Sequence, residues 1–427
     1  MFRALFLALA IQQQAAPRDS VVVIRAGRLI DGVSEAVVTD QAILVQNGRI
    51  AAVGPWAQVR RPAGARVIDL SNATVLPGLI DNHTHLLLQG DITSAEYDEQ
   101  VLYQSIPYRA ILGARNAQRA LMQGFTALRD VETEGAMYAD VDIRRAINRG
   151  EIPGPRLWVA TRALAPTGAY GVTTPNWDLE LPGGVQFADG PDQIRLAVRE
   201  QVRNGADLIK FYADRRYYIG PDSVLHSWPN YTDAEMAALV DEAHRQGRPV
   251  AAHAVGREGI DAALRAGVNT IEHGQGITPD LAQRMAAQGV YWCPTLFVGR
   301  YVAEGRTRGG APIWTQMLAY HRRAFEAALG AGVRISYGTD AGGFAWTEPL
   351  TRDFPIMVEF GMTPMQAIRS ATSVAAQLLG QEANIGSIQA GRYADIIAVV
   401  GEPDRDITAL DQVRFVMKAG VVVRDDR

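Results

Sequence analysis

The chain is 427 residues long, with 48% hydrophobic residues, 21% charged residues and a formal net charge of −4. These values are typical of a folded protein with a sizeable buried core, and they exclude a disordered chain. The positive charges are scattered along the sequence, so no basic patch of the kind that binds nucleic acid is expected.

Cys293 is the only cysteine of the chain. A single thiol excludes an intrachain disulfide and any metal site built from several thiolates. Any bound metal must therefore be held by nitrogen and oxygen ligands.

The chain begins with a segment, residues 1–19, that has the composition of a secretory signal. Arg3 precedes an apolar run over residues 4–11, and two small residues follow at Ala15 and Ala16. We therefore expect a signal peptide and a periplasmic or secreted protein. The alternative is a disordered start to a cytoplasmic protein. No later stretch approaches the roughly 20 apolar residues of a membrane span.

Both ends of the remaining chain have the pattern of short β-strands. Residues 20–76 contain the apolar runs VVVIRAGRLI and AILVQNGRIAAVG, the second interrupted by the turn pair Asn47-Gly48. Residues 384–427 contain ADIIAVV and VRFVMKAGVVVRDD. We expect the two ends to form one small β-sandwich domain.

Between these ends, residues 77–383 alternate apolar strands with helical stretches, a pattern that predicts a parallel sheet. Eight strands can be counted: TVLPGLIDNHTH, FTALRD, RLWVAT, DLIKFY, PVAAHA, NTIEH, VYWCPT and VRISYGTD. A further helix is expected from about residue 364 to 380. The predicted fold class is α/β, a (β/α)₈ TIM-like barrel beside a small β-sandwich.

Active sites of such barrels lie at the carboxyl ends of the strands, so polar residues that close an apolar strand are the site candidates. His83 and His85 are two apart on the first strand, so their imidazoles share a face and can bind one ion. The alternative for this pair is two exposed strand-end histidines. The full candidate set comprises His83, His85, Lys210, His253, His273 and Asp340. We expect His226, His244 and His321 to be surface or packing residues.

Lys210 would direct an amine toward a cationic site, which is unfavourable unless the amine loses its proton or is modified. A carbamate would resolve the conflict, because it offers an anionic oxygen ligand able to bridge two metals. The alternative is an ion pair with Asp207 or Asp214.

Asp340 can bind a metal and also carry a proton from water to a leaving nitrogen. Its alternative role is a helix N-cap. His253 and His273, taken singly, would be core histidines; their position at strand ends beside the other candidates favours metal binding.

Candidates for substrate binding follow the fourth strand. Arg215, Arg216, Tyr217 and Tyr218 could meet a substrate carboxylate, the alternative being a solvated loop. Loop aromatics are also expected to border the site, although such residues often only pack the loop: Tyr170, Trp177, Phe297, Phe344 and Trp346.

The motifs LPGLIDNHTHL, GFTALRD, GADLIKFY, VAAHAVG, TIEHG and SYGTDAGG, with the tail IGSIQAGRYADIIAV, resemble the amidohydrolase superfamily over nearly the whole chain after residue 20. The resemblance implies a metal-bearing barrel and two Zn²⁺ ions bridged by carboxylated Lys210. It also implies that His83, His85 and Asp340 bind one ion and that His253 and His273 bind the other.

Within the superfamily, GFTALRD and GADLIK resemble the branch of imidazolonepropionase-like and carboxypeptidase-like enzymes, and the chain is similar to bacterial amidohydrolases that hydrolyse ochratoxin A. One departure concerns substrate binding. Many members carry TGGH after the third strand, where this chain has Thr167-Gly168-Ala169-Tyr170. Tyr170 is therefore a further candidate for contact with the substrate.

The resemblance implies a zinc-dependent amidohydrolase that cleaves an amide bond to a C-terminal amino acid, in N-acyl amino acids, dipeptides or ochratoxin A. A cyclic-amide hydrolase and a non-catalytic binding protein remain alternatives. A deaminase is disfavoured, because Gly256 stands where deaminases carry a proton-shuttling Glu and because deaminases lack the lysine of the fourth strand. The expected partners are a small-molecule amide and further copies of the chain in a homo-oligomer.

Overall fold

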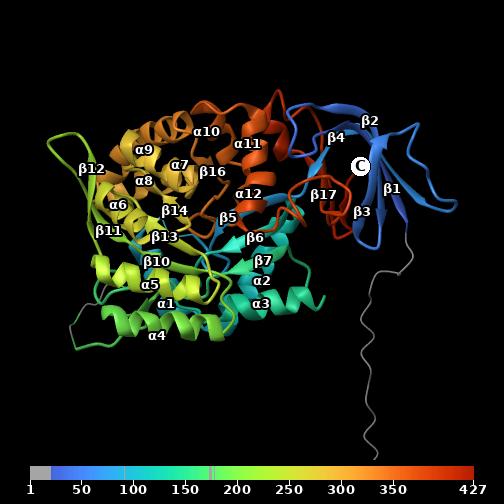
Figure 1. Cartoon of the computed structure of the whole chain (residues 1–427). Coiled ribbons are helices and arrows are strands. Elements are labelled where there is room, and N and C mark those ends of the chain that lie inside the picture. The colour runs from blue at the N-terminus through green and yellow to red at the C-terminus, as the bar shows by residue number, and fades with distance from the viewer. Residues whose placement is uncertain (1–20, 91, 173–175, 177) are drawn as a thin grey trace, which may run out of the picture.

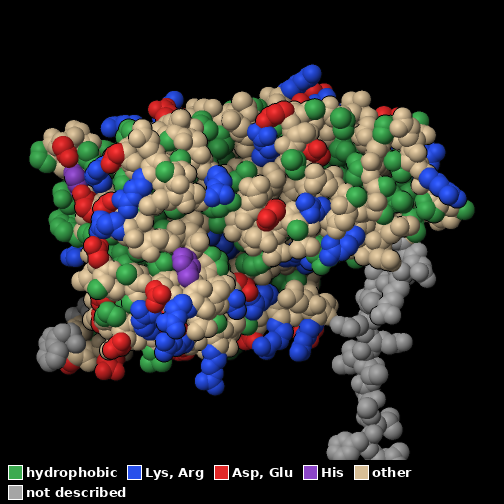
Figure 2. Space-filling model, in the orientation of Figure 1, with side chains coloured by type: hydrophobic (Ala, Val, Ile, Leu, Met, Phe, Trp, Pro, Cys, Tyr) green, Lys and Arg blue, Asp and Glu red, His purple; other side chains and the backbone are tan. Residues whose placement is uncertain are grey.

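The computed structural model describes residues 21–90, 92–172, 176 and 178–427. The predicted signal segment and Trp177 lie outside the described residues. Within the described part of the chain, no helix combines the length and apolar character needed to cross a membrane. On the face shown in Figure 2, acidic and basic side chains are interspersed.

Both ends of the chain contribute to one seven-stranded sheet, ordered β19-β18-β17-β4-β1-β2-β3. Its two halves meet where β17 pairs antiparallel with β4, with Ile397 opposite Leu76. The blue and red strands therefore lie together in Figure 1. The strands are β1 (Val22–Leu29), β2 (Val38–Gln46), β3 (Arg49–Pro55), β4 (Arg66–Pro77), β17 (Ile396–Val399), β18 (Val413–Lys418) and β19 (Val421–Asp425).

The sheet folds over on itself around an apolar core. Asn47 and Gly48 both have positive φ, 51° and 75°, which matches the tight turn expected between β2 and β3. The edge strand β3 then meets the segment before β17, because the Ile50 amide donates to the Arg392 carbonyl at 2.9 Å. The buried side chains Ile24, Ile43 and Phe415 belong to one cluster inside this fold.

Eight parallel strands form the barrel, and all eight coincide with predicted ones. They are β5 (Leu79–Thr84), β6 (Phe125–Asp130), β7 (Arg156–Val159), β10 (Ile209–Tyr212), β13 (Val250–Ala254), β14 (Thr270–His273), β15 (Tyr291–Cys293) and β16 (Arg334–Ile335). The barrel closes because the Asn82 amide donates to the Tyr337 carbonyl at 2.9 Å, and the Asp207 amide to the Val159 carbonyl at 2.8 Å. The predicted fold class is confirmed.

Helices surround the barrel, as Figure 1 shows. Their apolar side chains belong to one large buried cluster with those of the strands. Several begin at a side-chain cap; Thr232 and Glu235, for example, form a capping box at the start of α5. The helices are α1 (Ser94–Tyr103), α2 (Ile106–Met122), α3 (Ala139–Asn148), α4 (Gly190–Arg203), α5 (Asp233–Arg245), α6 (Arg257–Ala266), α7 (Pro279–Gln288), α8 (Leu296–Arg308), α9 (Ile313–Gly330) and α10 (Asp353–Glu359).

The helix expected from about residue 364 to 380 is two helices, α11 (Pro364–Ser370) and α12 (Ser373–Leu378). The barrel itself causes the break. The Ser370 carbonyl accepts from the Tyr337 amide at 2.9 Å, and the Ala371 carbonyl accepts from the Ile80 amide at 2.8 Å. These two carbonyls are therefore not available to continue the helix.

Smaller elements complete the fold. The hairpin of β11 (Asp214–Ile219) and β12 (Leu225–Pro229) follows β10 and lies at the end of the barrel away from the small domain in Figure 1. The remaining elements are β8 (Leu164–Ala165), β9 (Gln186–Phe187) and the 3₁₀ helix η1 (Ile407–Asp411).

Candidate metal centre

The four strand-end histidines form a tight group at the carboxyl end of the barrel. The ring centroids of His83 and His85 are 5.4 Å apart, those of His83 and His273 are 4.9 Å apart, and those of His253 and His273 are 4.5 Å apart. The Asp340 carboxylate lies between the first pair, with Oδ1 at 3.1 Å from His85 Nε2 and 3.6 Å from His83 Nε2. His83, His85 and Asp340 offer ligand atoms close enough together to hold one ion.

Backbone contacts hold Asp340 against the first strand. The Asp340 amide donates to the His83 carbonyl at 2.8 Å, and the His85 amide donates to the Ala341 carbonyl at 2.7 Å. Gly342 permits this close approach: its φ is +108°, and a Cβ there would lie 2.4 Å from the His85 carbonyl oxygen. These hydrogen bonds hold the segment after the last barrel strand against the end of the first strand at the site.

Three of the imidazoles have one nitrogen fixed by a neighbour. His83 Nδ1 lies 2.6 Å from Glu272 Oε2, His273 Nδ1 lies 2.8 Å from Thr295 Oγ1, and His253 Nε2 lies 2.7 Å from the Tyr217 hydroxyl. The second nitrogen of each ring is then free for a metal, which is the usual arrangement of metal-binding histidines. His83 Nε2 is buried without a hydrogen-bond partner, as expected for an atom that a metal would satisfy.

Burial favours the neutral form of three of the four imidazoles, whereas at His85 the carboxylates of Asp340 and Glu134 outweigh burial and raise the pKa to about 9. Burial holds the pKa values of His83, His253 and His273 well below their usual range. Burial opposes ionisation of Asp340, but the hydrogen bond from His85 and the nearby positive charges outweigh it and lower the pKa of this carboxyl. The donor set is therefore suited to a divalent cation.

Glu272 supports His83 from behind, and the sequence reasoning missed it. Its carboxylate also accepts hydrogen bonds from Arg129 Nη2 at 2.7 Å and from Thr270 Oγ1 at 2.5 Å, and its side chain is fully buried. The available signal was an acidic residue inside the apolar strand TIEH, directly before a candidate ligand.

Lys210 lies on β10 at this rim and is 1% exposed. Burial lowers the pKa of its ammonium group, which favours the neutral amine. Neither proposed acidic partner contacts it: Asp207 accepts from the Val159 amide at 3.0 Å, and Asp214 accepts from the Gly256 amide at 2.9 Å. Among the described residues, no carboxylate lies within ion-pair distance of the Lys210 amine.

Several residues of the site adopt a left-handed backbone conformation that is strained for residues other than glycine. The φ angles are 72° at His273, 64° at Asp340, 52° at Thr295 and 49° at Glu134. Such strain persists where the surrounding structure imposes it, and it is found preferentially at functional sites.

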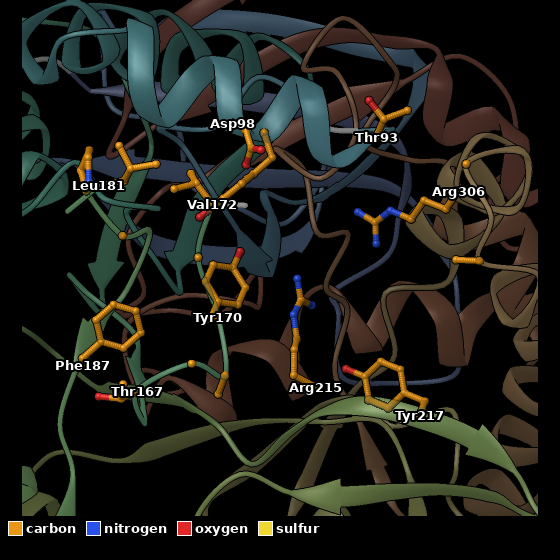
Figure 3. A pocket seen from close by; sticks show the side chains of 18 of the residues that line it. Thr93, Asp98, Thr167, Tyr170, Val172, Leu181, Phe187, Arg215, Tyr217 and Arg306 are labelled. Carbon is orange, nitrogen blue, oxygen red and sulfur yellow. The ribbon is translucent and has the colours of Figure 1, made fainter. Parts of the chain in front are cut away.

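Two neighbouring chambers that share lining residues lie at the rim. The inner chamber has a volume of about 80 cubic ångströms and is lined by residues that include His85, Lys210, His273 and Asp340. The outer chamber has a volume of about 900 cubic ångströms. Both are bordered by Tyr170, Arg215, Tyr217, Arg306 and Trp314, and Figure 3 shows the Arg215 side chain rising into the cavity.

The alternation of β11 divides the four candidates that follow the fourth strand. Arg215 and Tyr217 line both chambers. Arg216 and Tyr218 lie on the other face, where they stack on Trp228 at 5.9 Å and 4.4 Å. The structure therefore brings Arg215 and Tyr217 to the site and not Arg216 or Tyr218.

The barrel, the small domain and the strand-end ligands together match a known family. The Amidohydrolase family model fits residues 74–423. The chain belongs to the amidohydrolase family. A second, shorter match joins residues 42–61 to an imidazolonepropionase-like composite domain of bacteria.

Relatives of this amidohydrolase include ochratoxinase of Aspergillus niger, 31% identical over 421 residues, 93% of this chain and 84% of the relative. Among solved structures, a Xaa-Pro dipeptidase with bound methionine in the active site has a TM-score of 0.84 and 33% identity, covering 95% of this chain and 100% of that one. A prolidase complexed with N-methylphosphonate-L-proline has a TM-score of 0.84 and 28% identity, and the match covers 95% of this chain and 100% of the prolidase chain. The protein is a hydrolase that acts on amide C–N bonds.

Tyr170 occupies the position at which this amidohydrolase departs from TGGH. Its hydroxyl donates to Glu134 Oε2 at 2.9 Å, so this proton is not free for a substrate. The ring stacks on Tyr212 with centroids 4.5 Å apart and lies under the Arg215 guanidinium at 4.6 Å. Tyr170 therefore borders the cavity and supports Arg215.

The other three candidate aromatics in the described part of the chain pack the scaffold, and Phe297 lies in α8 and not in a loop. Phe344 and Trp346 are buried, and Phe297 meets Phe344 edge to face at 5.1 Å. None of the three lines either chamber. The segments border the site as expected, because the neighbouring residues Val298 and Gly343 line the inner chamber, but the three aromatic side chains themselves do not.

Gly256, the position of the deaminase glutamate, begins helix α6. A Cβ there would lie 2.5 Å from Ser227 Cβ and 2.6 Å from the His226 carbonyl carbon. The hairpin strand β12 therefore excludes a larger side chain, so this amidohydrolase has no room for the deaminase acid.

Proposed function

We propose that this amidohydrolase is a two-zinc enzyme that cleaves the amide bond to a C-terminal amino acid, in N-acyl amino acids or dipeptides and including ochratoxin A. The observation that carries the proposal is that Arg215 lines the same inner chamber as His85, His253 and His273 and also lines the outer chamber. This arrangement offers one site for the amide and a separate site for a carboxylate.

The proposed ligands fit a binuclear centre by their chemistry. His83, His85 and Asp340 would hold one ion and His253 and His273 the other, with Lys210 as a carboxylated bridge. Two zinc ions bound there would lower the pKa of a nucleophilic water and polarise the amide carbonyl. The buried, weakly basic amine of Lys210 supports the carbamate, because only the neutral amine reacts with carbon dioxide.

Asp340 would move the proton. Its carboxylate has a lowered pKa and is therefore ionised at neutral pH, ready to take a proton from water and to deliver it to the departing nitrogen. Its backbone contact with His83 would keep the carboxylate at the centre throughout.

Arg215 and Tyr217 would bind the substrate carboxylate. Arg215 has no carboxylate within ion-pair distance among the described residues, and its guanidinium lies over the rings of Tyr170 and Tyr212, at 4.6 Å and 5.5 Å from their centroids. A charge-assisted hydrogen bond to an incoming carboxylate would satisfy it. The methionine and the proline phosphonate bound by two related structures are each built on an amino acid, which supports this assignment.

The second candidate function is hydrolysis of a cyclic amide, favoured by the imidazolonepropionase-like match at residues 42–61. The test is an assay of N-acyl amino acids, dipeptides and ochratoxin A beside hydantoin- and imidazolone-like rings. Release of a free amino acid from the open-chain substrates supports the proposal. Turnover confined to the ring substrates would contradict it.

A further inference from the structure

His85 differs from the other three histidines of the site. Its Nδ1 is buried and has no hydrogen-bond partner, whereas one nitrogen of each of the other three rings is fixed within 2.8 Å. Glu134 Oε1 lies 3.6 Å from this nitrogen. Metal-bound imidazoles almost always donate their second nitrogen to a carboxylate, a carbonyl or water, so His85 has one such partner within reach.

Glu134 is held in place independently of His85. Its backbone carbonyl accepts from Arg109 Nη1 at 2.7 Å, and the same guanidinium donates to the Leu87 carbonyl at 3.0 Å, which ties this loop to the segment after His85. The strained φ of 49° at Glu134 is maintained by these contacts.

The carboxylate of Glu134 is also fixed. Its Oε2 accepts hydrogen bonds from the hydroxyls of Tyr97 and Tyr170, each at 2.9 Å, and the side chain is 4% exposed. Both phenol donors therefore bind the same oxygen and leave Oε1 directed at His85. The two tyrosines also line the outer chamber.

We infer that Glu134 is a positioning residue of the metal centre: it holds Nδ1 of His85 so that Nε2 faces the metal, and it is itself held by Tyr97 and Tyr170. This inference rests on the metal centre proposed above. It gives Tyr170 a role in metal binding as well as in bordering the cavity.

The cluster contains a second buried acid, Glu132. Its Oε2 accepts from the Tyr212 hydroxyl at 2.6 Å, and its Oε1 is buried without a partner. His85, Glu132 and Glu134 place ligand atoms within 4.8 Å of one another, so a cation bound by this cluster is the competing interpretation. The experiment below distinguishes the two.

The test is zinc titration of the metal-free full chain against a chromophoric chelator, for the wild type, Glu134→Gln, Tyr170→Phe and Glu132→Gln. Asp140→Asn is the matched control, because Asp140 is a fully buried carboxylate that accepts from the Thr161 amide at 2.8 Å. We expect Glu134→Gln to weaken binding of one of two zinc ions by about 10- to 100-fold. Tyr170→Phe should weaken it less, and Asp140→Asn should leave it unchanged.

Cobalt loading gives a readout that does not depend on overall stability. The visible spectrum of cobalt-loaded Glu134→Gln should differ from that of the wild type, and Glu134→Asp should partly restore it. If Glu134→Gln does not fold, the smaller Tyr170→Phe change carries the same test.

Four outcomes would overturn the inference. Equal zinc affinity and equal cobalt spectra in the wild type, Glu134→Gln and Tyr170→Phe would do so, as would a loss confined to Glu132→Gln. A third equivalent of metal in the wild type that disappears in Glu134→Gln would show that the cluster itself binds a cation. A wild type that binds no zinc would contradict the proposed function as well, whereas the other outcomes leave it standing.

Discussion

The Asp340 carboxylate lies 3.1 Å from Nε2 of His85, and this contact links the carboxyl ends of the first and last strands of the barrel. This proximity underlies the first prediction. Asp340→Asn keeps the size and an oxygen ligand but cannot accept the proton of water. We expect kcat to fall about 100- to 10,000-fold, the usual contribution of a general acid–base group, while zinc content stays near that of the wild type. A wild-type kcat in the Asp340→Asn enzyme would show that Asp340 does not transfer the proton.

The proposed carboxylation of Lys210 can be tested with a single other lysine side chain as the control. Lys210 and Lys418 are the only two lysines, and the Lys418 amine donates to the Gly154 carbonyl at 2.5 Å. In ¹³C-bicarbonate buffer, we expect one carbamate resonance in the ¹³C NMR spectrum of the zinc-loaded protein. The resonance should persist in Lys418→Arg and vanish in Lys210→Arg, which should also bind less zinc. A carbamate resonance that survives in Lys210→Arg would refute the assignment of the bridge.

Arg215 and its neighbour Arg216 form a matched pair, because they lie on opposite faces of β11. Hydrogen bonds to charged groups contribute about 1.5–3 kcal/mol, so Arg215→Met should raise KM for an N-acyl amino acid by about 10- to 150-fold. The effect should disappear for the same substrate with its carboxylate converted to an amide. Arg216→Met should leave KM unchanged. Equal effects of the two substitutions on KM would contradict the proposal that Arg215, and not Arg216, binds the substrate carboxylate.

His321 provides a prediction about stability. Burial lowers its pKa to about 4, so the folded protein holds this ring neutral while the unfolded chain takes up a proton near pH 6.5. The unfolded state then binds more protons, and the free energy of unfolding falls as the pH drops from about 6.5 to 4, by up to about 3 kcal/mol. Denaturant titrations of the wild type and His321→Gln should differ in their pH dependence within this window. Parallel curves would show that His321 does not contribute.

The sequence allowed the barrel and its candidate ligands to be predicted for a local reason. Each ligand ends or interrupts an apolar strand, as in NTIEH and VRISYGTD, and the carboxyl ends of parallel strands meet at one rim. Such a local pattern can be recognised in the sequence without knowing which residues are neighbours in the folded chain. The sequence does not show which face of β11 meets the cavity. It therefore could not distinguish Arg215, which lines the cavity, from Arg216, which lies on the opposite face of the β11–β12 hairpin.

What escaped prediction depends on contacts between distant segments. Glu272 matters because Arg129 and His83 converge on it, and Glu134 because Arg109 and two tyrosines hold it. The break between α11 and α12 likewise follows from two carbonyls that accept hydrogen bonds from the amides of Ile80, in β5, and Tyr337, which follows β16. Apart from the acidic residue inside the strand TIEH, these relationships leave no local pattern in the chain.

The most direct test of the account is the metal content of the gently purified full chain, measured by mass spectrometry together with amide hydrolysis before and after chelation. The account predicts two zinc ions per chain, loss of hydrolysis when they are removed and recovery when zinc is restored. Fewer than one ion per chain in a preparation that still hydrolyses amides would contradict it.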